Sequence, residues 1–360
     1  YFASPDLVFT GGGSFSRDRE DRSSPDDLGG ETPTIVYTTS GYGAALAKFG
    51  PTSVNLGTTF DRYDFRDVPA PGSFLGFINN DDRDRDIFTA GTRVGYQLNE
   101  RNEVFTTATY DQRQYMEPVD DGGFNRDSQG VRVAAGFRNR GDTLDTEIYG
   151  GWIYQSYVDP EFDEVSALDI GGQFIWRPLA GLSIEGELER RLQEATFEAA
   201  PLGSWGVLQT FASLGVYAWA RPDLRLNAGV SYYYNIYDGT DRRDQFTEYA
   251  LGVRKYVAPH LYLGAGYTFI GRDSNIIRES FDQQVAMIRI GRTQDPAYAP
   301  TDLYNPNVAR PQSAGLYVGM LAGHLAPETK LRGGRGGPPP ARGILQADFG
   351  DRGFEAGGFV

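Results

Sequence analysis

The stretch that decides the fold reads Gly181-Leu-Ser-Ile-Glu-Gly-Glu-Leu-Glu-Arg-Arg-Leu192. As a β-strand, with side chains alternating between two faces, it has an apolar face and an acidic face, which carry Leu182, Ile184, Gly186 and Leu188, and Ser183, Glu185, Glu187 and Glu189, respectively. In a water-soluble sandwich the apolar face would line the core, whereas in a membrane barrel it would meet lipid and the acids would face the lumen. The choice depends on how often, and at what spacing, the pattern recurs.

The composition favours many strands joined by turns. The chain of 360 residues has 46 Gly, 22 Tyr and 22 Phe but only 3 Met, and it has no long Leu-rich helical pattern. It has no Cys, which excludes a disulfide framework, a thiolate metal site and a Cys nucleophile. The net charge of −14 argues against a nucleic-acid-binding protein. The sequence therefore predicts an all-β protein.

The alternation recurs in segments separated by two kinds of connection. Strands are predicted at residues 6–16, 34–48, 53–65 and 86–98, and fourteen strands are predicted before residue 293. Short turns recur about forty residues apart, at 139–142, 178–181, 221–223 and 258–260. Longer acidic loops are predicted at 117–127, 158–164, 195–203, 238–244 and 271–279. If the first strand begins on the short-turn side, every long loop lies at the opposite end.

This asymmetry is typical of outer-membrane barrels. The chain has no run of 18 apolar residues, but strands of about ten alternating residues can also cross a membrane. Two interfacial girdles are predicted from aromatic residues near strand ends, namely Tyr96, Trp176, Trp219 and Tyr256 by short turns and Tyr63, Tyr115, Tyr157 and Tyr237 by long loops. We expect a transmembrane antiparallel up-and-down β-barrel of about 16 strands (range 14–18), with short periplasmic turns and long extracellular loops. The alternative is a secreted soluble β-protein.

The last part of the chain breaks the rhythm. We expect residues 1–294 to form fourteen strands of the barrel, residues 295–312 to form a Pro-rich linker, and residues 313–360 to supply two further strands that complete it. The start of a second small barrel is the alternative for 313–360. The abrupt beginning at Tyr1 indicates a processed or trimmed chain without its targeting sequence.

The polar faces of the predicted strands carry charges of both signs. The candidate lumen-lining residues are Arg93, Asp111, Arg113, Arg132, Arg138, Glu147, Asp169, Arg177, Glu185, Glu187, Glu189, Arg191, Arg225, Glu248 and Arg254. They could line a hydrated lumen that sorts solutes by size and charge. They could equally form a salt-bridged interior that fills a narrow barrel. Both interpretations stay open because strand alternation does not report pore radius.

No motif predicts catalysis or metal binding. The run Asp82-Arg-Asp-Arg-Asp86 has the spacing of the first three ligands of a calcium loop, but Ile87 stands where the loop needs Gly. We expect a solvated charge run there instead. The two histidines, His260 and His324, are isolated and form no catalytic set. We therefore expect no enzyme activity, no metal and no cofactor.

Several stretches carry a family resemblance, namely Leu168-Asp-Ile-Gly-Gly172, Trp176-Arg-Pro-Leu-Ala-Gly-Leu182, Glu185-Gly-Glu-Leu-Glu-Arg-Arg-Leu192, Tyr267 and Arg272-Asp-Ser-Asn275. Through them residues 85–292 resemble the putative beta-barrel porin 2 family of Gram-negative outer-membrane proteins. The resemblance implies an outer-membrane porin, in a family whose members are often linked to export of capsular or exopolysaccharide alongside a periplasmic export partner. The chain after residue 295 departs from the pattern.

Two functions follow as hypotheses. The first is an outer-membrane channel for passive passage of solutes, including secreted polysaccharide, in a Gram-negative bacterium. Its expected partners are outer-membrane lipid and lipopolysaccharide, together with a periplasmic polysaccharide-export protein implied by the resemblance. The alternative is a non-conducting structural barrel that anchors a protein or a surface-layer partner.

Overall fold

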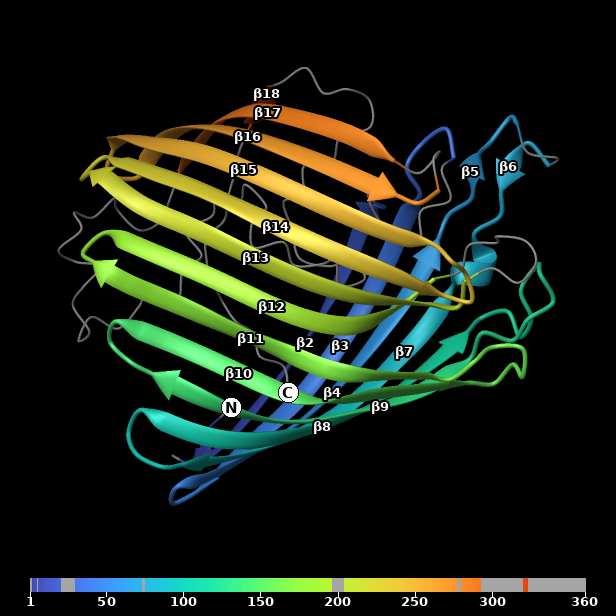
Figure 1. Cartoon of the computed structure of the whole chain (residues 1–360), viewed down its shortest axis with the longest axis horizontal. Coiled ribbons are helices and arrows are strands. Elements are labelled where there is room, and N and C mark those ends of the chain that lie inside the picture. Colours follow the sequence, from blue (N-terminus) through green and yellow to red (C-terminus); the bar gives the residue numbers. More distant parts are fainter. Residues whose placement is uncertain are drawn as a thin grey trace.

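One antiparallel sheet of 16 strands forms the body of the protein (Figure 1). This computed structural model describes residues 2–4, 6–20, 30–72, 75–195, 204–276, 280–292 and 320–322. The strands pair in the order β1 (Phe2–Ser4), β2 (Leu7–Arg19), β3 (Ile35–Phe49), β4 (Thr52–Phe65), β7 (Arg85–Gln97), β8 (Asn102–Tyr115), β9 (Ser128–Arg140), β10 (Leu144–Tyr157), β11 (Val165–Leu179), β12 (Leu182–Glu194), β13 (Gly206–Arg221), β14 (Leu224–Asp238), β15 (Arg243–Ala258), β16 (Leu261–Ser274), β17 (Phe281–Arg292) and β18 (Met320–Ala322).

Each strand from β2 to β17 pairs with the strands that precede and follow it in the sheet order, as in an up-and-down barrel, and β1 and β18 are the first and last strands of that order. Between β4 and β7 the chain forms a separate hairpin of β5 (Val68–Pro69) and β6 (Phe77–Ile78), followed by the 3₁₀ turn η1 (Asp81–Arg83). The sheet curls so that β2–β4 lie behind the strands coloured green and yellow in Figure 1. The predicted all-β, antiparallel barrel of about 16 strands is confirmed.

The connections differ at the two ends of the sheet. Short turns lie at the left of Figure 1, which we call the short-turn end, and the longer loops and the β5–β6 hairpin lie at the right, the long-loop end. Two short turns contain Gly50 (φ 61°) and Gly181 (φ 76°), whose left-handed backbone favours glycine. The β11–β12 register shifts between Trp176 and Leu179, beside Pro178, which has no N–H to donate. The predicted asymmetry between turns and loops is therefore confirmed.

The distribution of apolar side chains is the reverse of that in a water-soluble protein. Large apolar side chains on one face of the sheet are exposed, for example Ile148 (58%), Leu251 (57%) and Ile288 (67%). On the other face, polar residues such as Asp169 and Asn235 are fully buried. An apolar outer surface around a polar interior is what a barrel in lipid requires.

The prediction of two aromatic girdles is largely wrong. Tyr96 and Trp176 are exposed on the outer face near short turns, but Trp219 stacks on the buried Tyr256 on the inner face (5.6 Å between ring centroids). The tyrosines by the long loops also face inward, and we call them the tyrosine collar: Tyr63, Tyr115, Tyr157 and Tyr237. Nearness to a strand end does not determine the face of a side chain, which depends on its place in the two-residue alternation.

The predicted division after residue 294 lies almost entirely outside the described residues. Within it, β18 pairs with residues 288–290 of β17. The Pro-rich linker, the two completing strands and the alternative second barrel therefore stay predictions. No helix in the described part of the chain is long and apolar enough to span a membrane.

The outer face predicts a position-dependent penalty for charge. Leu251 lies near the middle of β15, so Leu251→Arg should lower the free energy of unfolding by roughly 2–4 kcal/mol. Gln245→Arg, on the same face close to the long loops, should cost about 0–1 kcal/mol. Urea titration of the protein in lipid vesicles, followed by tryptophan fluorescence, measures both. Equal penalties at the two positions would contradict the assignment of this face to lipid.

Candidate functional site

A network of charges lies on the inner face towards the short-turn end. Arg93 of β7 binds Glu147 of β10 through two hydrogen bonds (2.9 and 3.1 Å) and also donates to Glu103 of β8 (3.2 Å). Arg138 lies 3.7 Å from Glu147, and Arg140 lies 3.3 Å from Glu103. The network therefore connects β7 to β10, which are separated by two strands.

A second ion pair lies in the middle of the inner face. Arg132 of β9 donates to both carboxylate oxygens of Asp169 of β11 (2.5 and 2.8 Å) and to the Tyr149 hydroxyl (2.9 Å). Gly151 of the intervening β10 pairs in register with both Asp169 and Ala134. Arg132 therefore reaches across β10 to the fully buried Asp169.

The acidic face of β12 adjoins polar side chains of the next strands. Arg191 lies 3.7 Å from Glu189 and donates to Gln209 of β13 (2.9 Å), which in turn donates to Asn235 of β14 (2.8 Å). Glu185 accepts from the Ser183 hydroxyl (2.9 Å). A row in register across the sheet contains Glu147, Gln173, Glu187, Ser213, Ser231 and Glu248.

Arg225 and Arg254 are directly opposite each other on β14 and β15. Their guanidinium groups lie over aromatic rings, Arg225 over Tyr217 (5.5 Å) and Arg254 over Tyr262 (4.4 Å). The electron-rich faces of these rings offset the repulsion between like charges. Arg177 is also on the inner face, beside the register shift of β11. All the predicted lumen charges thus share the inner face, but whether they border an open pore stays a prediction.

At the long-loop end, side chains reach across more of the sheet. Arg113 of β8 forms ion pairs with Asp111 (2.8 Å) and with Glu194 of β12. Tyr115 of the collar donates its hydroxyl to Glu194 (2.6 Å). Arg85 lies between two tyrosines of the collar, Tyr63 and Tyr115, with its guanidinium 5.5 and 5.8 Å from their ring centroids. Arg85, Tyr115 and Glu194 are all buried at the long-loop end.

Three long loops are joined by one arginine and stacked rings. Arg126, in the loop after β8, pairs with Asp120 (2.5 Å) and donates to the carbonyl oxygens of Ala195 and Ser204 (3.1 and 3.2 Å), which lie beyond β12 and before β13. Phe162, in the loop after β10, stacks on Trp205 (5.0 Å). Loops from three hairpins thus pack together at the long-loop end.

The charge run at residues 82–86 is not solvated as predicted. Arg83 is fully buried, where it binds both carboxylate oxygens of Glu20 (2.6 and 3.0 Å) and Asn80 (3.0 Å) and lies over the Phe65 ring (4.2 Å). These contacts offset the free-energy cost of removing the guanidinium group from water. In the described part of the chain, no group of three or more His, Cys, Asp or Glu residues is arranged to hold a metal.

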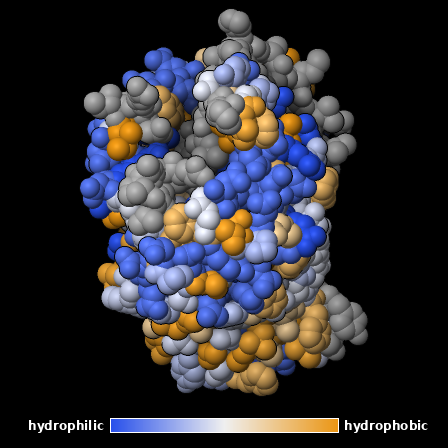
Figure 2. All heavy atoms as spheres, turned by 90° about the vertical axis from the view of Figure 1, so that its right-hand side faces the viewer, coloured by the Kyte–Doolittle hydropathy of each residue, from blue (hydrophilic) through white to orange (hydrophobic). Residues whose placement is uncertain are grey.

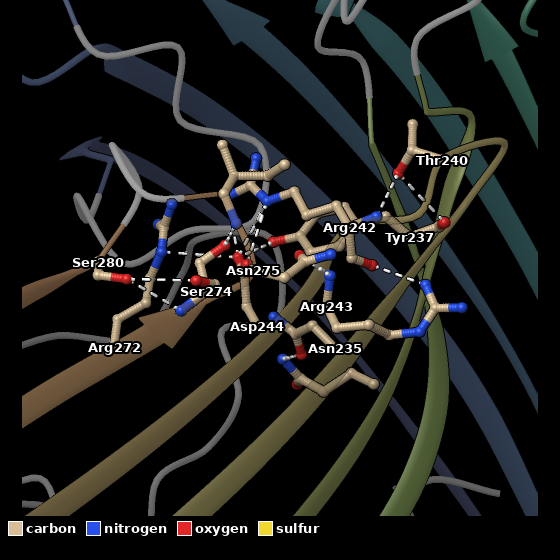
Figure 3. A network of polar contacts seen from close by, with 12 residues as sticks. Asn235, Tyr237, Thr240, Arg242, Arg243, Asp244, Arg272, Ser274, Asn275 and Ser280 are labelled. Carbon is tan, nitrogen blue, oxygen red and sulfur yellow. Dashed lines mark hydrogen bonds and ion pairs between the residues drawn. The ribbon is translucent and has the colours of Figure 1, made fainter.

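Another group of polar residues at the long-loop end surrounds Asp244 of β15 (Figure 3). This fully buried carboxylate accepts hydrogen bonds from the Tyr237 hydroxyl (2.7 Å) and Arg242 (2.9 Å), and Arg272 of β16 lies 3.5 Å away. Nearby, Asn275 accepts from the backbone N–H of Arg243 (2.8 Å). The contacts hold the ends of β14, β15 and β16 together.

The sequence prediction missed several members of these networks. Glu103 and Asp244 occupy inner positions of their strands, so a complete two-residue alternation could have found them. Glu194 has the parity of the outward Leu188 and turns inward only at the end of β12, so alternation would have missed it. No local pattern indicates that Glu20 and Arg83, in separate connections, form a pair.

Exposure varies from one inward charge to the next. Near the middle of the strands and towards the short turns, the side chains of Arg132, Arg138 and Glu189 keep 33%, 31% and 28% of their surface exposed. At the long-loop end the values are 11% for Arg113 and 4% for Glu194, and Asp169 in the middle and Arg254 towards the short turns are buried as well. Figure 2, which faces the long-loop end, shows a largely hydrophilic surface with scattered apolar residues.

An antiparallel sheet that is apolar outside and lined with paired charges inside defines an outer-membrane β-barrel. The chain belongs to the family described as putative beta-barrel porin 2, which matches residues 4–293. No curated protein matches the chain.

The chain is also similar to solved structures of low sequence identity. The FrpB iron transporter from Neisseria meningitidis (F5-1 variant) is 9% identical with a TM-score of 0.52, over 81% of this chain and 56% of that one. The siderophore receptor PirA from Acinetobacter baumannii is 10% identical with a TM-score of 0.44, over 82% of this chain and 63% of that one. The chain spans about half the length of the first solved structures it matches.

The central ion pair predicts a stability effect. Asp169→Asn should lower the free energy of unfolding by about 2–3 kcal/mol, less than the full loss of a buried pair because Arg132 is partly hydrated. The control Asp142→Asn removes a partner of Arg101 at an exposed pair and should change stability by no more than about 0.5 kcal/mol. Urea unfolding in vesicles measures both, and equal effects would contradict a structural role for the central pair.

The loop carboxyl of Asp84 predicts a pH effect. Burial raises its pKa from 3.8 to about 6, opposed by the hydrogen bond from the Phe65 backbone N–H (2.6 Å), while nearby Asp64 and Asp81 add to the increase. Because the pKa of Asp84 is raised in the folded state, the ionised carboxylate destabilises this loop at pH 7. The loop becomes more stable as the pH falls through about 6 and Asp84 is protonated.

Hydrogen exchange of residues 65–67, corrected for intrinsic rates, should therefore be slower at pH 5 than at pH 7. Asp84→Asn should remove the difference. A pH dependence that persists in the variant would assign it to another group.

Proposed function

We propose that the protein is an outer-membrane channel of a Gram-negative bacterium, through which solutes pass without any bond being made or broken. In this proposal the short turns face the periplasm and the long loops face the exterior. Membership of the porin family and the apolar outer face support the placement. The fold of the FrpB transporter agrees with it.

The observation that carries the proposal is the partial hydration of inward charges. Arg132 and Glu189 lie within β9 and β12, away from the strand ends, and Arg138 lies two residues from the short-turn end of β9, yet 28–33% of each side chain stays exposed. Charges of both signs that contact water within a barrel select solutes by charge as well as size. A solid salt-bridged filling would leave such groups dry.

Secreted polysaccharide is the cargo we propose, on the basis of the family resemblance. The inner face offers Arg, Glu, Gln and Tyr groups that can bond sugar hydroxyls, and Tyr149 is held in place by Arg132. A periplasmic export protein would deliver the chain to the short-turn end, and lipopolysaccharide would surround the barrel. The proposal includes no enzyme activity.

A second function is favoured by the packed long-loop end. The tyrosine collar, the Arg113–Glu194 pair and the Arg126 contacts bury the groups that would border the exit. If these contacts are permanent, the barrel is closed and serves to anchor a protein or surface-layer partner. If they open, they form the narrowest part of the channel.

Planar-bilayer recording distinguishes the two functions. We expect steady single-channel currents from the purified protein, and we expect secreted polysaccharide added on the short-turn side to block them. Replacing the three inward acids of β12 (Glu185→Gln, Glu187→Gln, Glu189→Gln) should shift the reversal potential in a salt gradient towards anion selectivity.

The control variant removes three exposed acids from turns and loops (Glu31→Gln, Glu100→Gln, Glu161→Gln) and should shift the reversal potential less. Absence of current at all voltages would favour the anchoring function. Currents with the same selectivity in all three proteins would show that β12 does not line the conducting path.

A further inference from the structure

Four arginines gather on the outer, lipid-facing side of the sheet at the long-loop end. We call this group the outer arginine patch: Arg17, Arg19, Arg62 and Arg66. All four are exposed, which contrasts with the buried arginines of the interior. The patch stands out because the whole chain carries a net charge of −14. The outward positions at the same end of β8–β10 are uncharged, namely Gln112, Gln114, Gln129 and Ser156.

The patch is held together by an aromatic ring. Tyr37 of β3 accepts a hydrogen bond from Arg17 Nε (3.2 Å) and pairs in register with Arg17 and with Asp64. The guanidinium groups of Arg17 and Arg66 lie 5.8 and 5.3 Å from its ring centroid. The phenol therefore positions two cations side by side at the surface, which reduces the entropy lost when both bind one anion.

Acidic residues neutralise only part of the patch. Arg62 forms a bidentate ion pair with Asp86 (2.6 and 2.7 Å), and Arg66 lies 3.2 Å from Asp64. Arg17 and Arg19 form no ion pair with an acidic residue among those that the structure describes. An excess of positive charge thus remains exposed on the outer face.

The aromatic residues beside the patch indicate its depth in the membrane. Phe15 is 68% exposed on the same face and stacks on Tyr37 (6.0 Å between centroids). Phe60 and Phe88, each 41% exposed, pair in register on β4 and β7. Apolar rings directly below charged groups mark the boundary between hydrocarbon and headgroups, where interfacial aromatic residues gather.

We propose that the outer arginine patch binds the phosphate groups of a phosphorylated glycolipid in the outer leaflet, while Phe15 and Phe60 contact its acyl chains. Guanidinium groups form paired, charge-assisted hydrogen bonds to phosphate oxygens, and basic residues near an anionic membrane surface are attracted to it. This inference rests on the proposed orientation of the barrel, with the long loops outside, but not on conduction.

The test is native mass spectrometry of the detergent-purified full chain with bis-phosphorylated lipid A and with the same lipid lacking both phosphates. We expect the chain to bind the phosphorylated form at least tenfold more tightly, with the difference falling as salt rises. The variant Arg17→Gln, Arg19→Gln, Arg66→Gln should lose this preference.

The control variant Lys48→Gln, Arg101→Gln, Arg221→Gln removes the same charge from exposed positions at the short-turn end and should keep the preference. Equal binding of the two lipids by the unmodified chain, or an unchanged preference in the patch variant, would overturn the proposal. Displacement of the lipid by equimolar inorganic phosphate would overturn it too, because the patch would then be a site for free anions.

Circular dichroism shows whether the patch variant is folded, and the salt dependence of the unmodified chain supplies a second test that needs no variant. Bilayer recording separates this inference from the proposed channel. A patch variant that conducts normally but has lost lipid preference supports both, whereas a chain that binds the lipid but never conducts leaves the patch in place and removes the channel.

Discussion

Charge pairing between strands that are not neighbours is the interaction on which the interior of this barrel depends. Each inward arginine or carboxylate has lost part of its hydration, and an unpaired buried charge is strongly destabilising. Arg93 reaches Glu147 across two intervening strands, and Arg132 reaches Asp169 across β10. Because side chains converge on the concave side of a curled sheet, groups on separated strands come within hydrogen-bonding distance there.

The same pairing leaves some inward charges partly hydrated and buries others. Near mid-strand and towards the short turns, the pairs leave Arg132, Arg138 and Glu189 partly hydrated. At the long-loop end, tyrosines and loop residues such as Arg126 close over the pairs and exclude water. The proposed channel and the alternative anchoring barrel differ in whether the packed long-loop end opens.

The sequence predicted the fold well because a two-residue alternation and the spacing of turns are local properties. The strand predicted at 53–65 is β4 (Thr52–Phe65), and the one predicted at 86–98 is β7 (Arg85–Gln97). The aromatic girdles were predicted from distance to a strand end alone, and Tyr63 and Tyr237 face inward because of their parity.

The sequence could not predict which charged side chains pair across the interior. Alternation gives Glu194 the parity of the outward Leu188, and it does not give the curvature that brings this carboxylate to Arg113. The buried pair of Glu20 and Arg83 depends on two connections whose paths no local pattern defines.

The ion pairs between separated strands also have a mechanical consequence. If the chain were pulled from one terminus, β7–β12 would resist as one block, because Arg93, Arg113 and Arg132 fasten strands that hairpin-by-hairpin extraction would otherwise remove in turn.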